Sequence, residues 1–280
     1  MSASGQERLS EPSHEVVLTD YRALISEAQR ETEPQAVQIA DYDEIAQHIH
    51  DSALYYRSRG LGGNEARTAL REVYVHDQAN DLLAGFANIA IDAPAMSAVQ
   101  RWLDDHPAGS VTAQERVQAR ELAYLQCEYN NLVREVILGL RPSLDRPKLS
   151  ALLDTATGGR ATKFLHSVVT GMTAEIALFD SMRSMPGMTD VAFTDVDADF
   201  SGTDIIARFE GKTVGFDVKF DKNVSDEGIT RVYGIKMPHF TIGVPVETID
   251  DLGASQIGQK ALQRRMTTMF AASTSMTRSK

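Results

Sequence analysis

The chain has 280 residues and a net charge of −11, with 42% hydrophobic and 24% charged residues. These values are typical of a globular protein with one large domain or two smaller ones. The single cysteine, Cys127, excludes an internal disulfide and suits a reducing compartment. No run of about 18 apolar residues and no signal-peptide pattern is present, so we expect a cytoplasmic protein that does not contact a membrane.

The acidic charge is unevenly distributed along the chain. Residues 1–159 carry a net charge of −10, and residues 160–280 carry a net charge of −1. Half of the eight lysines lie within 25 residues, between Lys212 and Lys236. A polyanionic partner is therefore disfavoured for the first half and compatible with the second half.

The first half of the chain predicts helices only. Residues 1–14 are polar, and we expect a disordered tail there. The clearest helix runs from Thr112 to Leu140, where apolar residues recur at helical spacing and Thr112 forms a capping box with Glu115. Within the helical region, residues 15–145, further helices are predicted at 35–58, 64–75, 78–91 and 94–104, and a linker at Arg141–Pro147 with two prolines.

The pattern changes after the linker, and residues 146–272 predict an α/β unit. A helix is expected at about 160–185, and the tail at 273–280 is expected to fray. Between them the pattern predicts strands near 190–194, 203–209, 213–220 and 239–246, and then a helix at about 254–270.

The stretch GTDIIARFEGKTVGFDVKF, residues 202–220, predicts a β-hairpin. A turn at Glu210-Gly211 would place Asp204 opposite Asp217. One face would then be wholly apolar, and a slip of one residue would mix the two faces. A three-residue loop with Gly211 in a bulge is the alternative, and it would shift the pairing.

In this register the Cβ atoms of Asp204 and Asp217 would lie roughly 5 Å apart. Two opposed carboxylates are destabilising unless something neutralises them, and carboxylate oxygens are ligands that suit Mg²⁺ or Mn²⁺. Lys219 lies on the same face, so the three residues predict metal-assisted attack on a phosphodiester. The acid-x-Lys triplet alone has little weight, because it also occurs at Glu210-Gly211-Lys212. Solvated surface groups are the alternative interpretation of the two aspartates.

A third carboxylate favours a site. Apolar residues from Phe164 to Met182 form a helical stripe, and Glu175 lies inside it. A glutamate on the buried side of a helix is unfavourable unless it is paired or binds a cation. One shared site explains this glutamate and the aspartate pair together. The acidic run Asp195, Asp197 and Asp199 is expected to be a solvated loop.

These residues resemble the PD-(D/E)XK nuclease superfamily, whose core is the restriction-endonuclease-like fold. A helix with Glu175, a strand that opens with Gly202-Thr203-Asp204 and a partner strand with Asp217-Val218-Lys219 are similar in order to the family's αβββαβ core. The resemblance covers about residues 155–270, and no proline precedes Asp204. It implies an α/β fold with that core. It says nothing about the first 140 residues, where the residue pattern alone predicts an all-helical N-terminal region.

The resemblance also implies Mg²⁺-dependent (or Mn²⁺-dependent) cleavage of nucleic acid. Asp204 and Asp217 would be metal ligands, the backbone carbonyl of Val218 a further ligand, Glu175 a ligand or a base, and Lys219 the catalytic lysine. DNA is the expected partner, with RNA as an alternative and a homodimer as a possible assembly. The residues expected near nucleic acid are Lys222, Arg231, Lys236, Gln259, Lys260, Arg264 and Arg265.

Two other functions are compatible with the sequence. A catalytically silent nucleic-acid-binding or assembly protein could retain the fold without the chemistry. An enzyme that acts on small phosphates would use the same residues without binding nucleic acid.

Overall fold

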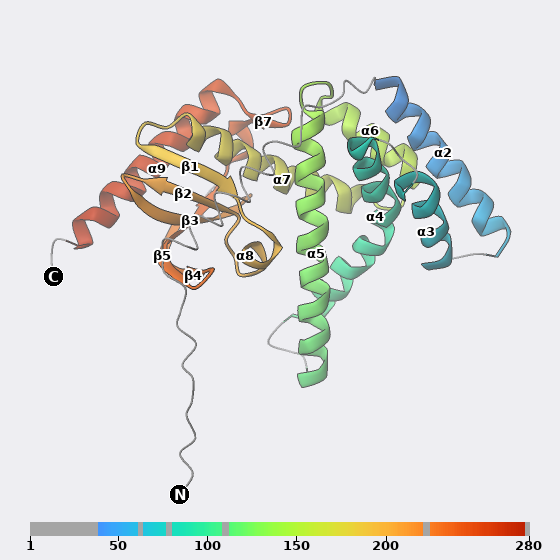
Figure 1. Ribbon diagram of the computed structural model, residues 1–280, viewed down its shortest axis with the longest axis horizontal. Helices are drawn as coiled ribbons and strands as arrows, with labels where there is room; N and C mark the ends of the chain where they lie inside the picture. The colour runs from blue at the N-terminus through green and yellow to red at the C-terminus, as the bar shows by residue number, and fades with distance from the viewer. Residues whose placement is uncertain (1–38, 61–63, 77–79, 108–111, 221–224, 278–280) are drawn as a thin grey trace, which may run out of the picture.

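The computed structural model describes residues 39–60, 64–76, 80–107, 112–220 and 225–277. The tail predicted at 1–14, the predicted helical pattern up to residue 38, and Lys222 lie outside these ranges. The described residues form a helical part followed by an α/β part, as expected, and the long helix α5 lies between the sheet and helices α2 to α4 (Figure 1). The helices of the first part are α2 (Ile39–Ser58), α3 (Asn64–Arg71), the π-helix η1 (Glu72–His76), α4 (Asp81–Asp105), α5 (Ala113–Leu140) and α6 (Arg146–Thr157).

Helix α4 corrects one prediction, because a single helix replaces the two that were expected at 78–91 and 94–104. It continues through Pro94, and Asn80 caps its start by accepting hydrogen bonds from the N–H groups of Leu82 and Leu83. The residues on both sides of the proline, including Ala93 and Met96, are buried in the helical core. Packing therefore holds the helix together where its local sequence predicts a break.

Among the described residues, α4 is also a helix long and apolar enough to cross a membrane, with a hydropathy of 1.5 over its most apolar window. Its buried face, which includes Phe86 and Ile89, packs against the side chain of Tyr42 and other core residues of the helical part. The same composition is found in the core helices of globular proteins.

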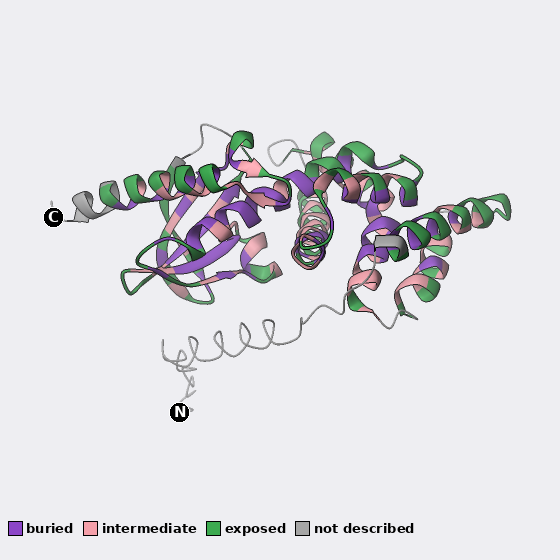
Figure 2. Ribbon diagram, turned by 90° about the horizontal axis from the view of Figure 1, so that it is seen from above, coloured by how far each residue is buried: buried purple, intermediate pink, exposed green. Residues whose placement is uncertain are grey.

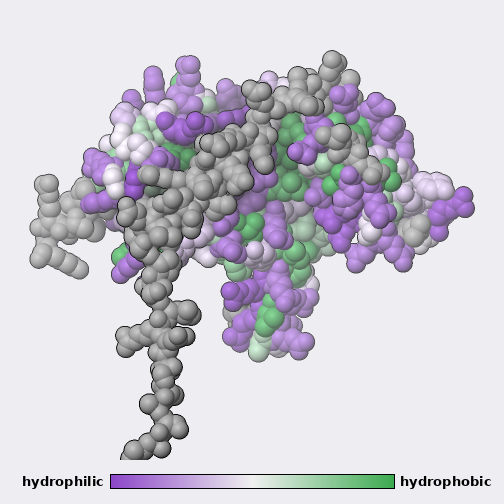
Figure 3. All heavy atoms as spheres, in the orientation of Figure 1, coloured by the Kyte–Doolittle hydropathy of each residue, from purple (hydrophilic) through white to green (hydrophobic). Residues whose placement is uncertain are grey.

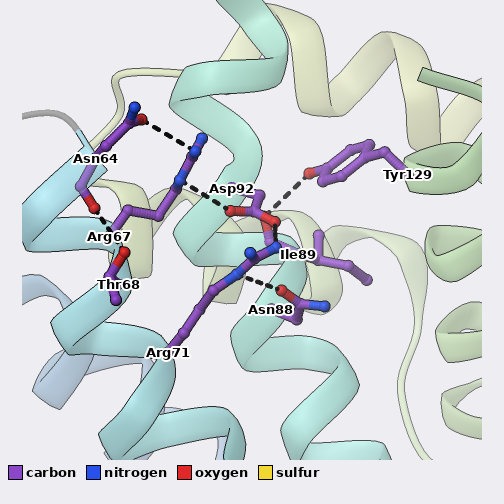
Figure 4. A network of polar contacts seen from close by, with 8 residues as sticks. All are labelled: Asn64, Arg67, Thr68, Arg71, Asn88, Ile89, Asp92 and Tyr129. Carbon is purple, nitrogen blue, oxygen red and sulfur yellow. Dashed lines mark hydrogen bonds and ion pairs between the residues drawn. The ribbon is translucent and has the colours of Figure 1, made fainter. Parts of the chain in front are cut away.

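A polar network joins α3, α4 and α5 around Asp92 (Figure 4). Arg71 donates to the Asp92 carboxylate, and the Arg67 guanidinium lies 3.7 Å from its other oxygen. Burial raises the pKa of Asp92, and the two arginines oppose that rise. Tyr129 of α5 donates its hydroxyl to the Ile89 carbonyl at 3.0 Å, so the network fixes α5 against α4.

Helix α5 begins as predicted, because Thr112 and Glu115 exchange both hydrogen bonds of the capping box. The apolar residues in the first half of this helix do not form a buried face, since Val117 and Leu125 are 60% and 47% exposed. That half projects beyond its neighbours, and hydrophobic side chains appear on it among hydrophilic ones (Figure 3).

The predicted linker is shorter than the sequence indicates, because α6 already begins at Arg146. Pro147 lies in its first turn, where a missing N–H removes no helical hydrogen bond, and Asp145 caps the helix. Leu149 and Leu152 are buried in the helical core, so α6 packs on the helical part although it follows the predicted boundary at residue 145. That boundary stays a prediction.

Helix α7 (Thr162–Arg183) belongs to both parts of the molecule. Its first half, including Phe164 and Met172, packs in the helical core, and its second half, including Leu178 and Met182, packs in the core of the α/β part. Figure 2 shows buried residues all along this helix. Glu175 lies where the two cores meet.

The α/β part contains a five-stranded sheet of order β1-β2-β3-β5-β4, in which only the β3–β5 pair is parallel. The expected αβββαβ order is not confirmed in the described residues: α8 lies between β1 and β2, strand β4 and not a helix lies between the parallel strands, and helix α9 follows β5. Neither β4 nor the short helix α8 was predicted. The elements are β1 (Met188–Phe193), α8 (Val196–Phe200), β2 (Ile205–Phe209), β3 (Lys212–Lys219), β4 (Ser225–Val232), β5 (Ile235–Gly243), the 3₁₀ helix η2 (Val246–Thr248), β6 (Ile249–Asp250), β7 (Gly253–Ala254) and α9 (Gln256–Thr277).

The hairpin register is as predicted. Phe209 pairs with Lys212 and Ile205 with Phe216, and both Glu210 and Gly211 have positive φ, as a two-residue turn of type I′ requires. The three-residue loop is therefore wrong. The apolar face packs on α7 and α9. Figure 2 shows from above how α9, which leads to the C-terminus, runs along the largely buried sheet. On the other face Ile206 packs in a second cluster with Ala198, Val232 and Met237, which explains its apolar side chain.

Gly258→Ala is expected to destabilise the protein by about 2 kcal/mol or more, because a Cβ there would lie 2.0 Å from the backbone oxygen of Thr248. The clash is with backbone and cannot be relieved by a rotamer change. Gly171→Ala is the matched control, since a Cβ inside α7 at that position meets no atom within 4 Å. It should stabilise the protein by up to about 1 kcal/mol. Urea unfolding measures both, and equal midpoints would contradict this packing of α9.

Candidate active site

The candidate site lies at one edge of the sheet, where β1 ends, β2 begins and β3 ends. The register pairs Phe193 with Ile205 and Ile205 with Phe216, so the three strand ends meet there. Thr194, which follows β1, donates its N–H to the carbonyl of Asp204 at 3.0 Å. Helices α5, α7 and α8 lie at this edge (Figure 1), so side chains from both parts of the molecule can reach it.

Asp204 is buried directly before β2. Its N–H donates at 2.8 Å to the carbonyl of Phe216, the residue that pairs with Ile205, so the regular pairing ends at Ile205 and does not extend to the predicted pair of Asp204 and Asp217. One carboxylate oxygen accepts a hydrogen bond from the N–H of Val218 at 2.6 Å. The pKa of Asp204 is raised well above its ordinary value, first by burial and then by the carboxyls of Glu175, Asp199 and Asp217.

Asp217 and Lys219 form an ion pair on the same face of β3, with 2.7 Å between the ammonium and a carboxylate oxygen. Thr241 of the neighbouring strand β5 lies 3.5 Å from the other oxygen. The Lys219 side chain is 55% exposed and that of Asp217 only 15%. The pKa of Lys219 is raised by Asp217, Asp204 and Glu175 against the opposing effect of burial, so its ammonium stays charged and interacts with the whole group of acids.

Glu175 is buried and lies close to Asp204 and Lys219. Its carboxylate accepts a hydrogen bond from Arg134 of α5 at 2.8 Å. Burial raises the pKa of Glu175 to about 7, and Arg134 limits that rise. Lys219 and Asp199 also act on this pKa, which indicates that they lie close to the carboxyl.

Asp199 is a fourth carboxyl in this group, and the expected solvated loop is wrong for it. The acidic run instead forms α8, in which Asp195 caps the helix and Asp199 is half-buried. The Asp199 carboxyl hydrogen-bonds to that of Asp204, and burial raises the pKa of Asp199. Asp195 and Asp197 are exposed, as expected.

Cys127 of α5 borders the acids. Burial, followed by the charges of Asp199, Asp204 and Glu175, raises the pKa of the thiol to about 12. It is therefore a protonated, half-buried thiol.

Four carboxyls against one guanidinium and one ammonium leave an excess of two negative charges when all are ionised. One divalent cation would balance that excess, and the donors are the oxygen ligands that Mg²⁺ and Mn²⁺ prefer. Within the described ranges, however, no three His, Cys, Asp or Glu side chains are grouped as a ready metal site. The carboxyls bond to Arg134, Lys219 and the Val218 N–H instead. The four residues therefore have the charge and the oxygen donors that suit a divalent cation, but their side chains are not arranged around one.

The residues predicted to contact nucleic acid are spread over the α/β part. Arg231 and Lys236 pair across the β4–β5 hairpin near its tip, whereas Gly243 at the other end of β5 pairs with Lys219. The register therefore separates them from the acids by the length of β5. On α9, Lys260 and Arg264 are exposed and Gln259 is half-buried. Arg265 donates to the Gly243 carbonyl at 2.7 Å, which places it at the same edge as Lys219.

Arg134 and Asp199 lie in the site but are not among the residues predicted from the sequence. Arg134 had a recognisable signal, because the run from Val133 to Leu140, VREVILGL, is apolar except for Arg134 and Glu135. A buried arginine needs an acidic partner, and the sequence offers Glu175 as a buried acid that also needs a partner. Asp199 had no such signal, since the side chain becomes buried only when α8 packs beside α5.

Comparisons with protein-family models, with curated proteins and with solved structures find no match to this chain.

Proposed function

We propose that this protein is a Mg²⁺- or Mn²⁺-dependent nuclease that hydrolyses DNA phosphodiester bonds, most simply as an endonuclease. The observation that supports it is the meeting of Glu175, Asp204, Asp217 and Lys219 at one edge of the sheet, although they come from three separate elements. Such a group of mutually repelling carboxyls, of which Glu175 and Asp204 are buried, is unfavourable on its own and is typical of a functional site.

Each residue has a distinct role in this proposal. Asp204, held by the Val218 N–H, and Asp217 would hold the cation, together with the Val218 carbonyl. A bound divalent cation would lower the pKa of a water and neutralise phosphate charge. Glu175, with a pKa of about 7, can accept a proton from the attacking water at neutral pH. Lys219 is charged and half-exposed, so it can contact a phosphate oxygen.

The test is cleavage of supercoiled plasmid DNA with Mg²⁺, Mn²⁺ or EDTA. Asp217→Asn and Lys219→Ala are expected to lower the rate by at least about 10²-fold. Asp190→Asn and Lys212→Ala are matched controls, because both positions are exposed and lie toward the other end of the sheet. Cleavage that survives EDTA, or that is equal in all five proteins, would contradict the proposal.

A second candidate is a catalytically silent DNA-binding or assembly protein. It is favoured by the ion pairs that already occupy Glu175 and Asp217. This candidate predicts DNA retention in a gel-shift assay that weakens with salt, with no cleavage under any metal. An enzyme that acts on small phosphates would show neither retention nor plasmid cleavage.

A further inference from the structure

We infer that Arg134 of the helical part is a positioning residue of the candidate site, so that the α/β part is incomplete without helix α5. This inference rests on the proposed function for its catalytic consequence. Its structural consequence, the placement of Asp204 and Glu175 relative to each other, can be measured independently.

Arg134 is held on three sides in the interior. Its side chain is 4% exposed, one guanidinium nitrogen donates to Glu175 at 2.8 Å, and the other donates to the Thr194 carbonyl at 3.3 Å. The guanidinium also lies over the Phe193 ring, 4.5 Å from the ring centre. A planar, forked donor suits this arrangement, and a flexible ammonium cannot reproduce it.

The contact with Thr194 links Arg134 to Asp204. The N–H of Thr194 donates to the Asp204 carbonyl at 3.0 Å, and its hydroxyl contacts the same oxygen at 3.2 Å. Arg134 therefore bonds to Glu175 on α7 and, through one residue, to the backbone of Asp204 before β2. Arg134 is thus the residue of α5 that connects Glu175 with Asp204 and sets the distance between their carboxyls.

A second ion pair between the same helices provides a matched comparison. Arg141, at the end of α5, donates to Asp180 of α7 at 2.8 Å, but the two side chains are 32% and 22% exposed. Asp180 lies beside Gly253, and no contact connects this pair to the acids in the described residues. The Arg141 pair can only join the helices, whereas the Arg134 pair joins them and also contacts the strand end.

The experiment compares full-length Arg134→Gln, Arg134→Lys and Arg141→Gln with the wild type. Arg134→Gln is expected to lower kcat by about 10²-fold with KM within about threefold, because the substrate-binding surface is kept and the reacting groups are displaced. Arg134→Lys should recover about tenfold of that loss, since it can pair with Glu175 but cannot also span to Thr194. Arg141→Gln should keep kcat within about twofold.

The backbone amide signals of Val218 and Asp204, followed by NMR, report the placement without any catalysis. They should move in Arg134→Gln, move less in Arg134→Lys and stay in place in Arg141→Gln. If Arg134→Gln does not fold, the Val218 and Asp204 signals of Arg134→Lys alone decide whether Arg134 positions the site. Unchanged Val218 and Asp204 signals in the Arg134 variants, or equal effects of Arg141→Gln, would overturn the inference. A wild type that cleaves nothing would instead contradict the nuclease proposal, and the NMR comparison would still decide the role of Arg134.

Discussion

Asp204→Asn is expected to lower DNA cleavage by at least about 10³-fold and, at pH 8, to stabilise the metal-free protein. The loss of activity follows from removing a charged metal ligand. The gain in stability follows because burial and three neighbouring carboxyls make the ionised Asp204 unfavourable in the folded state. Asparagine can keep the local hydrogen bonds: its oxygen accepts from Val218, and its amide group can donate to Asp199.

The expected gain in the free energy of unfolding is about 0.5–2 kcal/mol, the range common for relieving strain at active sites. Urea unfolding in EDTA at pH 8 measures it, and the plasmid assay measures the rate. Asp190→Asn is the control, an exposed aspartate whose substitution should change stability by less than about 0.5 kcal/mol. A destabilised Asp204→Asn with unchanged cleavage would show that the carboxyl is a structural group and not part of a site.

The stability of the metal-free protein is expected to fall as the pH rises from about 4.5 to about 7. Glu175 has its folded-state pKa raised to about 7 from an ordinary value of 4.5, so the folded state binds a proton that the unfolded state has already released. This proton contributes about 3 kcal/mol to the free energy of unfolding. The contribution is fully present below pH 4.5 and is lost as the pH rises through 7. The raised pKa values of Asp199 and Asp204 act in the same direction. Lys219 does not contribute in this window, since its pKa is raised from 10.5.

Divalent cations should reverse that loss. Because a cation binds ionised carboxylates, Mg²⁺ or Mn²⁺ should raise the melting temperature at pH 8 and leave it nearly unchanged at pH 5. Urea unfolding in EDTA at both pH values, and melting curves with and without metal, measure the two effects. Glu175→Gln should flatten the pH dependence. A stability that rises toward pH 8 without metal, or a Mg²⁺ effect equal at both pH values, would contradict the shared-cation interpretation.

The sequence predicts the hairpin and its acids well, because their pattern is local. Alternation with period two and a Glu-Gly turn favour the register that pairs Phe209 with Lys212, because a slip of one residue would expose the apolar face. The capping box of Thr112 is equally local. Predictions fail where packing overrides local preference, as in α4, which continues through Pro94 because its neighbours bury both sides of the proline.

Three features follow from the residue pattern alone: an α/β unit after a helical region, the hairpin register that pairs Ile205 with Phe216, and a buried glutamate in the preceding helix. The packing of the elements adds Arg134 and Asp199 to these residues. Periodicity reports which face of an element is buried, but it contains no information on which distant element covers that face. Arg134 and Glu175 are 41 residues apart in the chain, and they meet because α7 is shared between the two cores with α5 packed beside it.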